Sequence, residues 1–271
     1  SEHLGLYVIA DSGALIDLDG ATINVAGAVV LTATSTFNIN ATPADFDDVL
    51  ALAGLAVIGS AEIRINSTTL NAASLMAHAH VDVDYLLTAN ADDNDDADNT
   101  QADAAVTIVY LATEARTVVL GNANLQVTGD VTLKAETDAN VNATADGGSD
   151  GNLGATLALT IVDLTTEAAI TDTATVNATG ADADIVVQAI EDATVTTDAS
   201  STAGGADQNG GGNRSQDRLA NPDGWGNGSQ QQDNGDQVST ANGNVNFAGA
   251  AALAFFTSSS RASIDTSGSV Q

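Results

Sequence analysis

Two histidines and two aspartates alternate with single apolar residues in one short segment, at His78, His80, Asp82 and Asp84. Alternate side chains of a β-strand point to the same face, so all four polar groups would share one side. Two histidines at i and i+2 on a strand can both bind zinc, with a carboxylate as the third ligand. His78, His80 and Asp82 are therefore a candidate zinc site. The alternative interpretation is a polar stripe that faces water or a neighbouring coil of chain.

An aspartate-rich stretch, predicted as an acidic loop over residues 90–103, has the order of oxygen side chains found in helix–loop–helix calcium sites. Two features depart from that pattern: the sixth position is Ala97 instead of glycine, and the twelfth is aspartate instead of the longer glutamate. Helices are not expected on either side, and a solvated loop at a corner of the fold is the alternative. The only cofactor that we expect is therefore Ca²⁺, and its candidate ligands are Asp92, Asn94, Asp96, Asp98 and Asp103.

A polar insertion over residues 200–243 is rich in glycine, asparagine and glutamine and lacks strand periodicity. It contains the only tryptophan, Trp225, together with Arg214 and Arg218. An aromatic ring flanked by cations can anchor a glycan or a protein partner. These three residues are therefore candidate partner-binding residues, and a tolerated insertion at a surface corner is the alternative.

Composition excludes several classes of function. The 271 residues include Asp+Glu 36 against Lys+Arg 6, for a net charge of −30, and no cysteine. Such a charge repels phosphate groups, so neither nucleic acid nor an anionic membrane is expected as a partner. No apolar run approaches the roughly 20 residues of a membrane-spanning helix. With six basic residues and few aromatic ones to line a substrate groove, we expect no enzyme, and a polysaccharide-active enzyme is the weakest alternative.

Internal repetition is the most informative property of the chain. Apolar anchors recur at spacings of 47, 55, 51 and 94 residues, and the last spacing is long because it includes the polar insertion. The anchors are Ile23, Leu70, Leu125, Val176 and Val270. They predict one continuous array over residues 1–271, with units near 5–58, 59–110, 111–163 and 164–258 and the start of a further unit at 259–271. Because the last unit stops partway through its pattern, we expect neighbouring repeats or copies that stack end to end.

Within each unit the hydrophobic period is two. From Val131 to Ala143 the odd positions are apolar or threonine and the even positions are polar, which is typical of a half-buried strand. Small core side chains, scarce aromatics and many strands predict an all-β fold, a β-solenoid like a parallel β-helix built from repeats of about 50 residues. Tandem antiparallel β-sandwiches are the alternative. Whether one repeat makes one wide coil or two narrow rungs stays open at this point.

The repeats resemble those of a known family. Val127-Thr-Gly-Asp-Val-Thr-Leu-Lys-Ala-Glu-Thr137, the glycine-rich stretch 146–154, Gly154-Ala-Thr-Leu-Ala-Leu-Thr-Ile-Val162 and Thr166-Glu-Ala-Ala-Ile170 are similar to repeats of very large bacterial surface proteins, of the filamentous-adhesin and leukotoxin type. The resemblance covers most of residues 104–200. It implies export, display at the cell surface and a structural or adhesive role in a fibre, and it transfers no catalytic residue. We therefore expect an extracellular, non-enzymatic protein whose partners include glycans or surface proteins.

Overall fold

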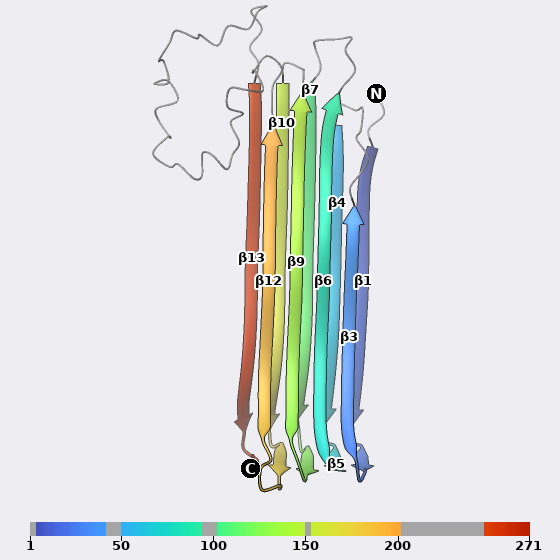
Figure 1. Cartoon of the computed structure of the whole chain (residues 1–271), viewed down its shortest axis with the longest axis vertical. Coiled ribbons are helices and arrows are strands. Elements are labelled where there is room, and N and C mark those ends of the chain that lie inside the picture. Colours follow the sequence, from blue (N-terminus) through green and yellow to red (C-terminus); the bar gives the residue numbers. More distant parts are fainter. Residues whose placement is uncertain (1–3, 42–49, 94–101, 150–152, 202–246) are drawn as a thin grey trace, which may run out of the picture.

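A computed structural model describes residues 4–41, 50–93, 102–149, 153–201 and 247–271. These residues form thirteen strands and no helix, and the long strands lie side by side along the long axis of the molecule (Figure 1). The all-β prediction is therefore confirmed for the part of the chain that the structure describes.

Each repeat of the chain makes one wide coil of three strands. In the first coil, the long β1 (Leu4–Asp19) is followed by the short β2 (Thr22–Asn24) and the long β3 (Ala28–Ala41). The long strands run in opposite directions, and the short strand joins them at one end of the molecule (Figure 1). The later strands are β4 (Leu50–Asn66), β5 (Thr69–Ala72), β6 (Ser74–Asp93), β7 (Ala102–Leu120), β8 (Asn124–Val127), β9 (Val131–Ser149), β10 (Leu153–Asp172), β11 (Thr175–Ala178), β12 (Ile185–Ser201) and β13 (Phe247–Thr266).

Equivalent strands of successive coils pair in parallel and form three sheets. Sheet A has the order β1-β4-β7-β10-β13, sheet B contains the short strands β2, β5, β8 and β11, and sheet C has the order β3-β6-β9-β12. Every one of these strand pairs is parallel, whereas a sandwich of the alternative kind would be built from antiparallel pairs. The β-solenoid prediction is confirmed, and one repeat corresponds to one wide coil.

The register of the coils follows the apolar anchors of the sequence. In sheet B, Ile23 pairs with Leu70, Leu70 with Leu125, and Leu125 with Val176. An isolated bridge then joins Val176 to Val270. The spacings of 47, 55, 51 and 94 residues are therefore the lengths of chain between stacked positions. Residues 202–246, within the last of these intervals, lie outside the described residues.

One sequence similarity does not correspond to stacking. The segments Thr113-Glu-Ala115 and Thr166-Glu-Ala168 are identical, and aligning them by 167 − 114 = 53 residues would place Glu167 beside Glu114. The observed register instead pairs Glu167 with Arg116, an offset of 51. The difference of two residues keeps every side chain on its own face of the sheet and exchanges a glutamate–glutamate neighbour for an ion pair.

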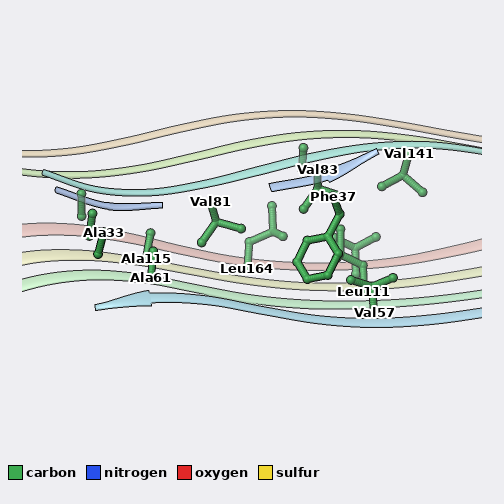
Figure 2. Packing of buried hydrophobic residues seen from close by; sticks show 14 of the residues in the cluster. Ala33, Phe37, Val57, Ala61, Val81, Val83, Leu111, Ala115, Val141 and Leu164 are labelled. Carbon is green, nitrogen blue, oxygen red and sulfur yellow. The ribbon is translucent and has the colours of Figure 1, made fainter. Parts of the chain in front are cut away.

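The core lies between sheets A and C and consists mainly of small aliphatic side chains. In β9 the alternation is confirmed, because Val131, Leu133 and Val141 are buried and the side chains between them face outward. Side chains from the facing sheets meet in the interior (Figure 2). The ring of Phe37 fits there because the opposite residue is Gly59, where a Cβ atom would approach that ring to 2.8 Å. A narrow core of this kind explains the scarcity of aromatic residues.

The unit boundaries suggested by the sequence fall inside strands. Positions 58/59, 110/111, 163/164 and 258/259 lie within β4, β7, β10 and β13, whereas the coils themselves begin where sheet A strands begin. A periodic array has no unique starting point, so the division into units remains a choice of phase.

Candidate functional site

The predicted histidine stripe lies on the outer face of sheet C. His78, His80 and Asp82 alternate along β6 with buried Ala79 and Val81, because successive side chains of a strand point to opposite faces. In the register of sheet C, His78 lies beside Lys134 of β9, and His80 lies beside Glu136. Strand alternation therefore gathers titratable side chains from two coils on one face.

Each histidine contacts a carboxylate of the next coil. Nε2 of His78 lies 2.9 Å from Oε2 of Glu136, and Nε2 of His80 lies 3.0 Å from Oδ2 of Asp138. Nζ of Lys134 donates to the same Glu136 oxygen at 2.6 Å. The two imidazole rings are stacked, with centroids 5.6 Å apart and an interplanar angle of 14°. The histidines thus bridge adjacent coils.

Burial and charge set the protonation of this cluster. Burial is the largest influence on the pKa of His78 and lowers it, the nearby Lys134 lowers it further, and Glu136 opposes both. For Glu136, burial alone would raise the pKa, but the hydrogen bond and charge of Lys134, together with His78, bring it below its ordinary value. An ionised carboxylate only accepts hydrogen bonds, so Nε2 of His78 carries the hydrogen. The pair is a neutral imidazole donating to a carboxylate held by lysine.

Zinc binding by His78, His80 and Asp82 stays a prediction. The structure places all three on one face, as expected, but directs each imidazole Nε2 toward a carboxylate of β9. Among the residues that the structure describes, no group of three histidine, aspartate or glutamate side chains is arranged to hold a metal ion. Zinc would have to displace Glu136 and Asp138, or bind through the other ring nitrogens.

Most of the other candidate residues lie outside the described residues. Of the candidate calcium ligands, Asp92 lies near the end of β6 and Asp103 near the start of β7. These two strands follow each other along the chain. The remaining ligands Asn94, Asp96 and Asp98, and the candidate partner-binding residues Arg214, Arg218 and Trp225, fall in segments that the structure does not describe. Calcium and partner binding through these residues stay predictions.

A row of aspartates crosses the same outer face of sheet C. Asp82 of β6 pairs with Asp138 of β9, and Asp138 pairs with Asp192 of β12. Neighbouring strands lie about 4.8 Å apart, so three carboxylates follow one another along the solenoid axis. Within this row, Asp138 contacts His80. Like charges at this spacing repel, which favours cations in the surrounding solvent.

A second charged row crosses the outer face of sheet A. Arg116 of β7 lies between Glu62 of β4 and Glu167 of β10. Its Nη2 is 3.0 Å from Oε2 of Glu167, and its Nη1 is 3.4 Å from Oε1 of Glu62. Arg64 contacts Glu62 at 3.0 Å and Asp17 of the first coil at 3.6 Å. Alternating charges thus link the first four strands of this sheet.

Reasoning from sequence did not find these inter-coil partners. These contacts join residues that are 51 to 58 positions apart in the sequence, so they form no local motif. The residues concerned include Glu136, Asp138, Glu62, Arg116 and Glu167. The anchor spacings contain part of the signal, because the spacing of 51 residues between Leu125 and Val176 also pairs Arg116 with Glu167. On sheet C the register differs from the anchor spacing: the anchors Leu70 and Leu125 are 55 residues apart, whereas His78 pairs with Lys134 at 56.

An open depression on sheet C is lined by residues that include Asn38, Asp84, Tyr85 and Asn140. No family model, curated protein or solved structure matches this chain. The resemblance to bacterial surface repeats therefore stays a prediction. Among the described residues there is no helix with the length and apolarity needed to cross a membrane.

Proposed function

We propose that this chain is a non-enzymatic structural or adhesive segment of a large extracellular surface or fibre protein. The observation that supports the proposal is the in-register parallel stacking of five long strands in sheet A, with one coil advancing the structure by one strand. Stacking of this kind extends the structure along its axis, because backbone hydrogen bonds and a continuous core join each coil to the next. Rows of charge that link successive coils favour a stiff rod.

The apolar core is open at both ends of the described coils. In β1, Val8, Ala10 and Ile16 face the interior but are only partly buried, whereas their neighbours in β4 are fully covered. At the other end, the inward Ile264 of β13 is 53% exposed. A further coil, from the same polypeptide or from another copy, would cover these side chains and pair the free strand edges.

Sedimentation velocity and electron microscopy of the chain test this proposal. We expect rods that lengthen with protein concentration, and shorter rods after Ile264→Lys, because the substitution places a charge where the next coil would stack. The control Val186→Lys alters an outward side chain of sheet C that is 41% exposed, and it should leave the rods unchanged. Rods of one length at every concentration would refute stacking of copies. Release of reducing ends from a panel of polysaccharides would refute the non-enzymatic assignment.

The aspartate row on sheet C favours a second candidate function, a cation-dependent module that binds a glycan or a surface protein. Cations would relieve the repulsion among Asp82, Asp138 and Asp192, and among the aspartates of the predicted acidic loop over residues 90–103. Thermal unfolding in EGTA and in millimolar Ca²⁺ separates the two functions. A melting temperature that rises with Ca²⁺, and no longer rises after Asp92→Ala/Asp96→Ala, would assign a calcium site to the loop. An unchanged melting curve would contradict the cation-dependent module and leave the structural function as the one supported.

A further inference from the structure

The outer face of sheet A carries a broad apolar surface in the half of the sheet nearest the starts of its strands. Six large side chains in two adjacent rows of this face are between 40% and 85% exposed: Tyr7, Ile9, Ile108, Tyr110, Leu253 and Phe255. We call these residues the apolar band. They belong to the first, third and fifth strands of the sheet, and the same rows in β4 and β10 hold only glycine, alanine, leucine and isoleucine.

The band is continuous because the coils stack in register. One row across the sheet reads Ile9, Ala56, Tyr110, Ile161 and Phe255. The two rows next to it, toward the strand starts, are also apolar. They consist of Tyr7, Gly54, Ile108, Leu159 and Leu253, and of Gly5, Leu52, Val106, Leu157 and Ala251. Residues on one face of a strand repeat about every 6.8 Å and strands lie about 4.8 Å apart, so three such rows over five strands cover about 500 Å². An exposed apolar patch of this size on a solenoid carrying a charge of −30 marks an interaction surface.

The surface is flat as well as apolar. Gly54 lies beside Tyr7 in the sheet, and a Cβ atom at Gly54 would come within 2.7 Å of the Tyr7 ring. A Cβ atom at Gly5 would come within 2.8 Å of the same ring. The ring therefore lies down over two glycines instead of standing up from the sheet. A plane of this shape fits another plane, as in the face-to-face packing of two β-sheets.

We propose that the apolar band is the contact surface for a second copy of this chain, packed face to face with sheet A against sheet A. Two bands together bury about 1,000 Å², which is the lower end of the range for specific protein interfaces and fits a weak, concentration-dependent dimer. The contact is isologous, because the same rows of both copies meet across a two-fold axis. Each added coil widens the band, so longer arrays associate more strongly.

The charges of the face select the orientation of the two copies. Carboxylates on this face begin one row beyond the band, with Asp11 and Asp163, and continue through the row of Glu62, Arg116 and Glu167. When the two copies run in opposite directions, the bands overlap and the charged halves project to opposite ends. Parallel copies would instead place acidic rows against each other. Antiparallel packing therefore minimises the repulsion between two chains of like charge.

Sedimentation velocity of the Ile264→Lys chain, in which end-to-end stacking is blocked, tests the proposal from micromolar to several hundred micromolar protein in low and in high NaCl. We expect a dimer whose dissociation constant falls as salt rises, because salt screens the repulsion and leaves the apolar contact intact. Tyr110→Asp places a charge in the middle of the band and should weaken the dimer at least about tenfold. Val186→Asp is the matched control, since Val186 on sheet C is 41% exposed and Tyr110 is 40% exposed.

Cross-linking gives a second readout that does not depend on a charged variant folding well. The chain contains no cysteine, so Ala56→Cys places a single thiol in the band and Asn140→Cys places one on the outer face of sheet C. A short bis-maleimide should join two copies of Ala56→Cys and leave Asn140→Cys largely monomeric. Ile264→Lys, which blocks stacking at the open end, should not reduce the cross-linking at Ala56→Cys.

Three results would overturn the proposal. The first is a chain that remains monomeric in high salt at the highest concentration. The second is a dimer that survives Tyr110→Asp unchanged while that variant keeps its circular dichroism spectrum and melting curve. The third is equal cross-linking through both cysteine positions. Vesicle binding by a monomer that is lost in Tyr110→Asp would assign the band to a lipid surface instead.

Discussion

Replacing Arg116 with methionine removes the cation at the centre of the charged row on sheet A and keeps most of the aliphatic stem. The guanidinium lies between Glu62 and Glu167 and is two-thirds covered, with a side-chain exposure of 32%. The two glutamates are exposed by 21% and 24%. These pairs are more protected than ordinary surface ion pairs, and the same cation also lies 3.4 Å from the half-exposed Glu114.

The expected loss of stability follows from that geometry. Pairs of this kind contribute up to about 1 kcal/mol each, and we assign that amount to the contacts with Glu62 and Glu167 and none to the one with Glu114. Without Arg116, the two remaining carboxylates lie two strands apart, about 10 Å, where their repulsion adds about 0.5 kcal/mol. The sum is about 2–3 kcal/mol. In a chain of this length each 1 kcal/mol lowers the melting temperature by about 2–4 °C, so we expect a decrease of about 5–10 °C.

Thermal and urea unfolding of Arg116→Met and the wild type, followed by circular dichroism, measures this loss. Raising NaCl from 20 to about 500 mM should reduce the difference between them, because salt screens both the lost attractions and the new repulsion. A second substitution, Glu167→Gln, should restore part of the stability lost in Arg116→Met. Arg261→Met is the control, since Arg261 lies beside Glu167 at the end of the same row but is exposed on the edge strand β13 and should contribute less.

If Arg116→Met melts at the wild-type temperature, or loses no more stability than Arg261→Met, the ion pairs of Arg116 do not stabilise the stacked coils. A loss that did not change with salt would indicate that packing of the arginine stem, and not its charge, stabilises the coils.

Other substitutions test the core, the turns and the histidine cluster. Tyr85→Phe removes a buried hydroxyl that has no hydrogen-bond partner in the structure, so urea unfolding should show unchanged or higher stability, by up to about 1–3 kcal/mol. A clear loss would mean that the hydroxyl is satisfied. Gly121 and Gly20 both have positive φ, of 64° and 60°, but only at Gly121 would a Cβ atom meet neighbouring side chains. Gly121→Ala should therefore cost more stability than Gly20→Ala, and equal costs would show that the neighbours move aside. Burial lowers the pKa of His78 below its ordinary 6.5, so the folded chain binds that proton less tightly than the unfolded chain. Its contribution to stability is present above pH 6.5 and decreases as the pH falls through the folded value. Histidine resonances recorded by NMR between pH 8 and 4 should show His78 titrating below 6.5, and a value above 6.5 would contradict the assignment.

The fold was predictable because its main constraints are periodic. Anchors such as Leu70, Leu125 and Val176 recur at the length of one coil, and the structure stacks them directly. The alternation from Val131 to Ala143 gave the correct inward face of β9. Alternation was weaker evidence in β4, β7 and β10, because their outer faces are apolar in the region of the band. A run of consecutive apolar residues is typical of a strand buried on both sides, but the structure leaves the outer side partly exposed at Ile58, Ile108 and Tyr110.

The candidate site was predictable only in part. Placing His78, His80 and Asp82 on one face required only the two-residue period of a strand. Their partners Glu136 and Asp138 depend on which residues of the next coil lie beside them, and a shift of two residues would exchange those partners without changing the buried face. The Thr-Glu-Ala motifs show the same limit, since local similarity suggested a neighbour for Glu167 that the register replaces with Arg116.

By itself, the sequence determined the all-β class, the repeat length and the choice of small core side chains, because each strand carries its own periodic pattern of buried and exposed residues. Only the tertiary structure decided that each repeat makes one wide coil of three strands, and which side chains meet on its outer faces. Neighbours there are one coil apart, so residues about 50 positions distant along the chain come to lie about 4.8 Å apart. The link between Arg116 and Glu167 and the row from Ile9 to Phe255 exist only once parallel coils are stacked in register.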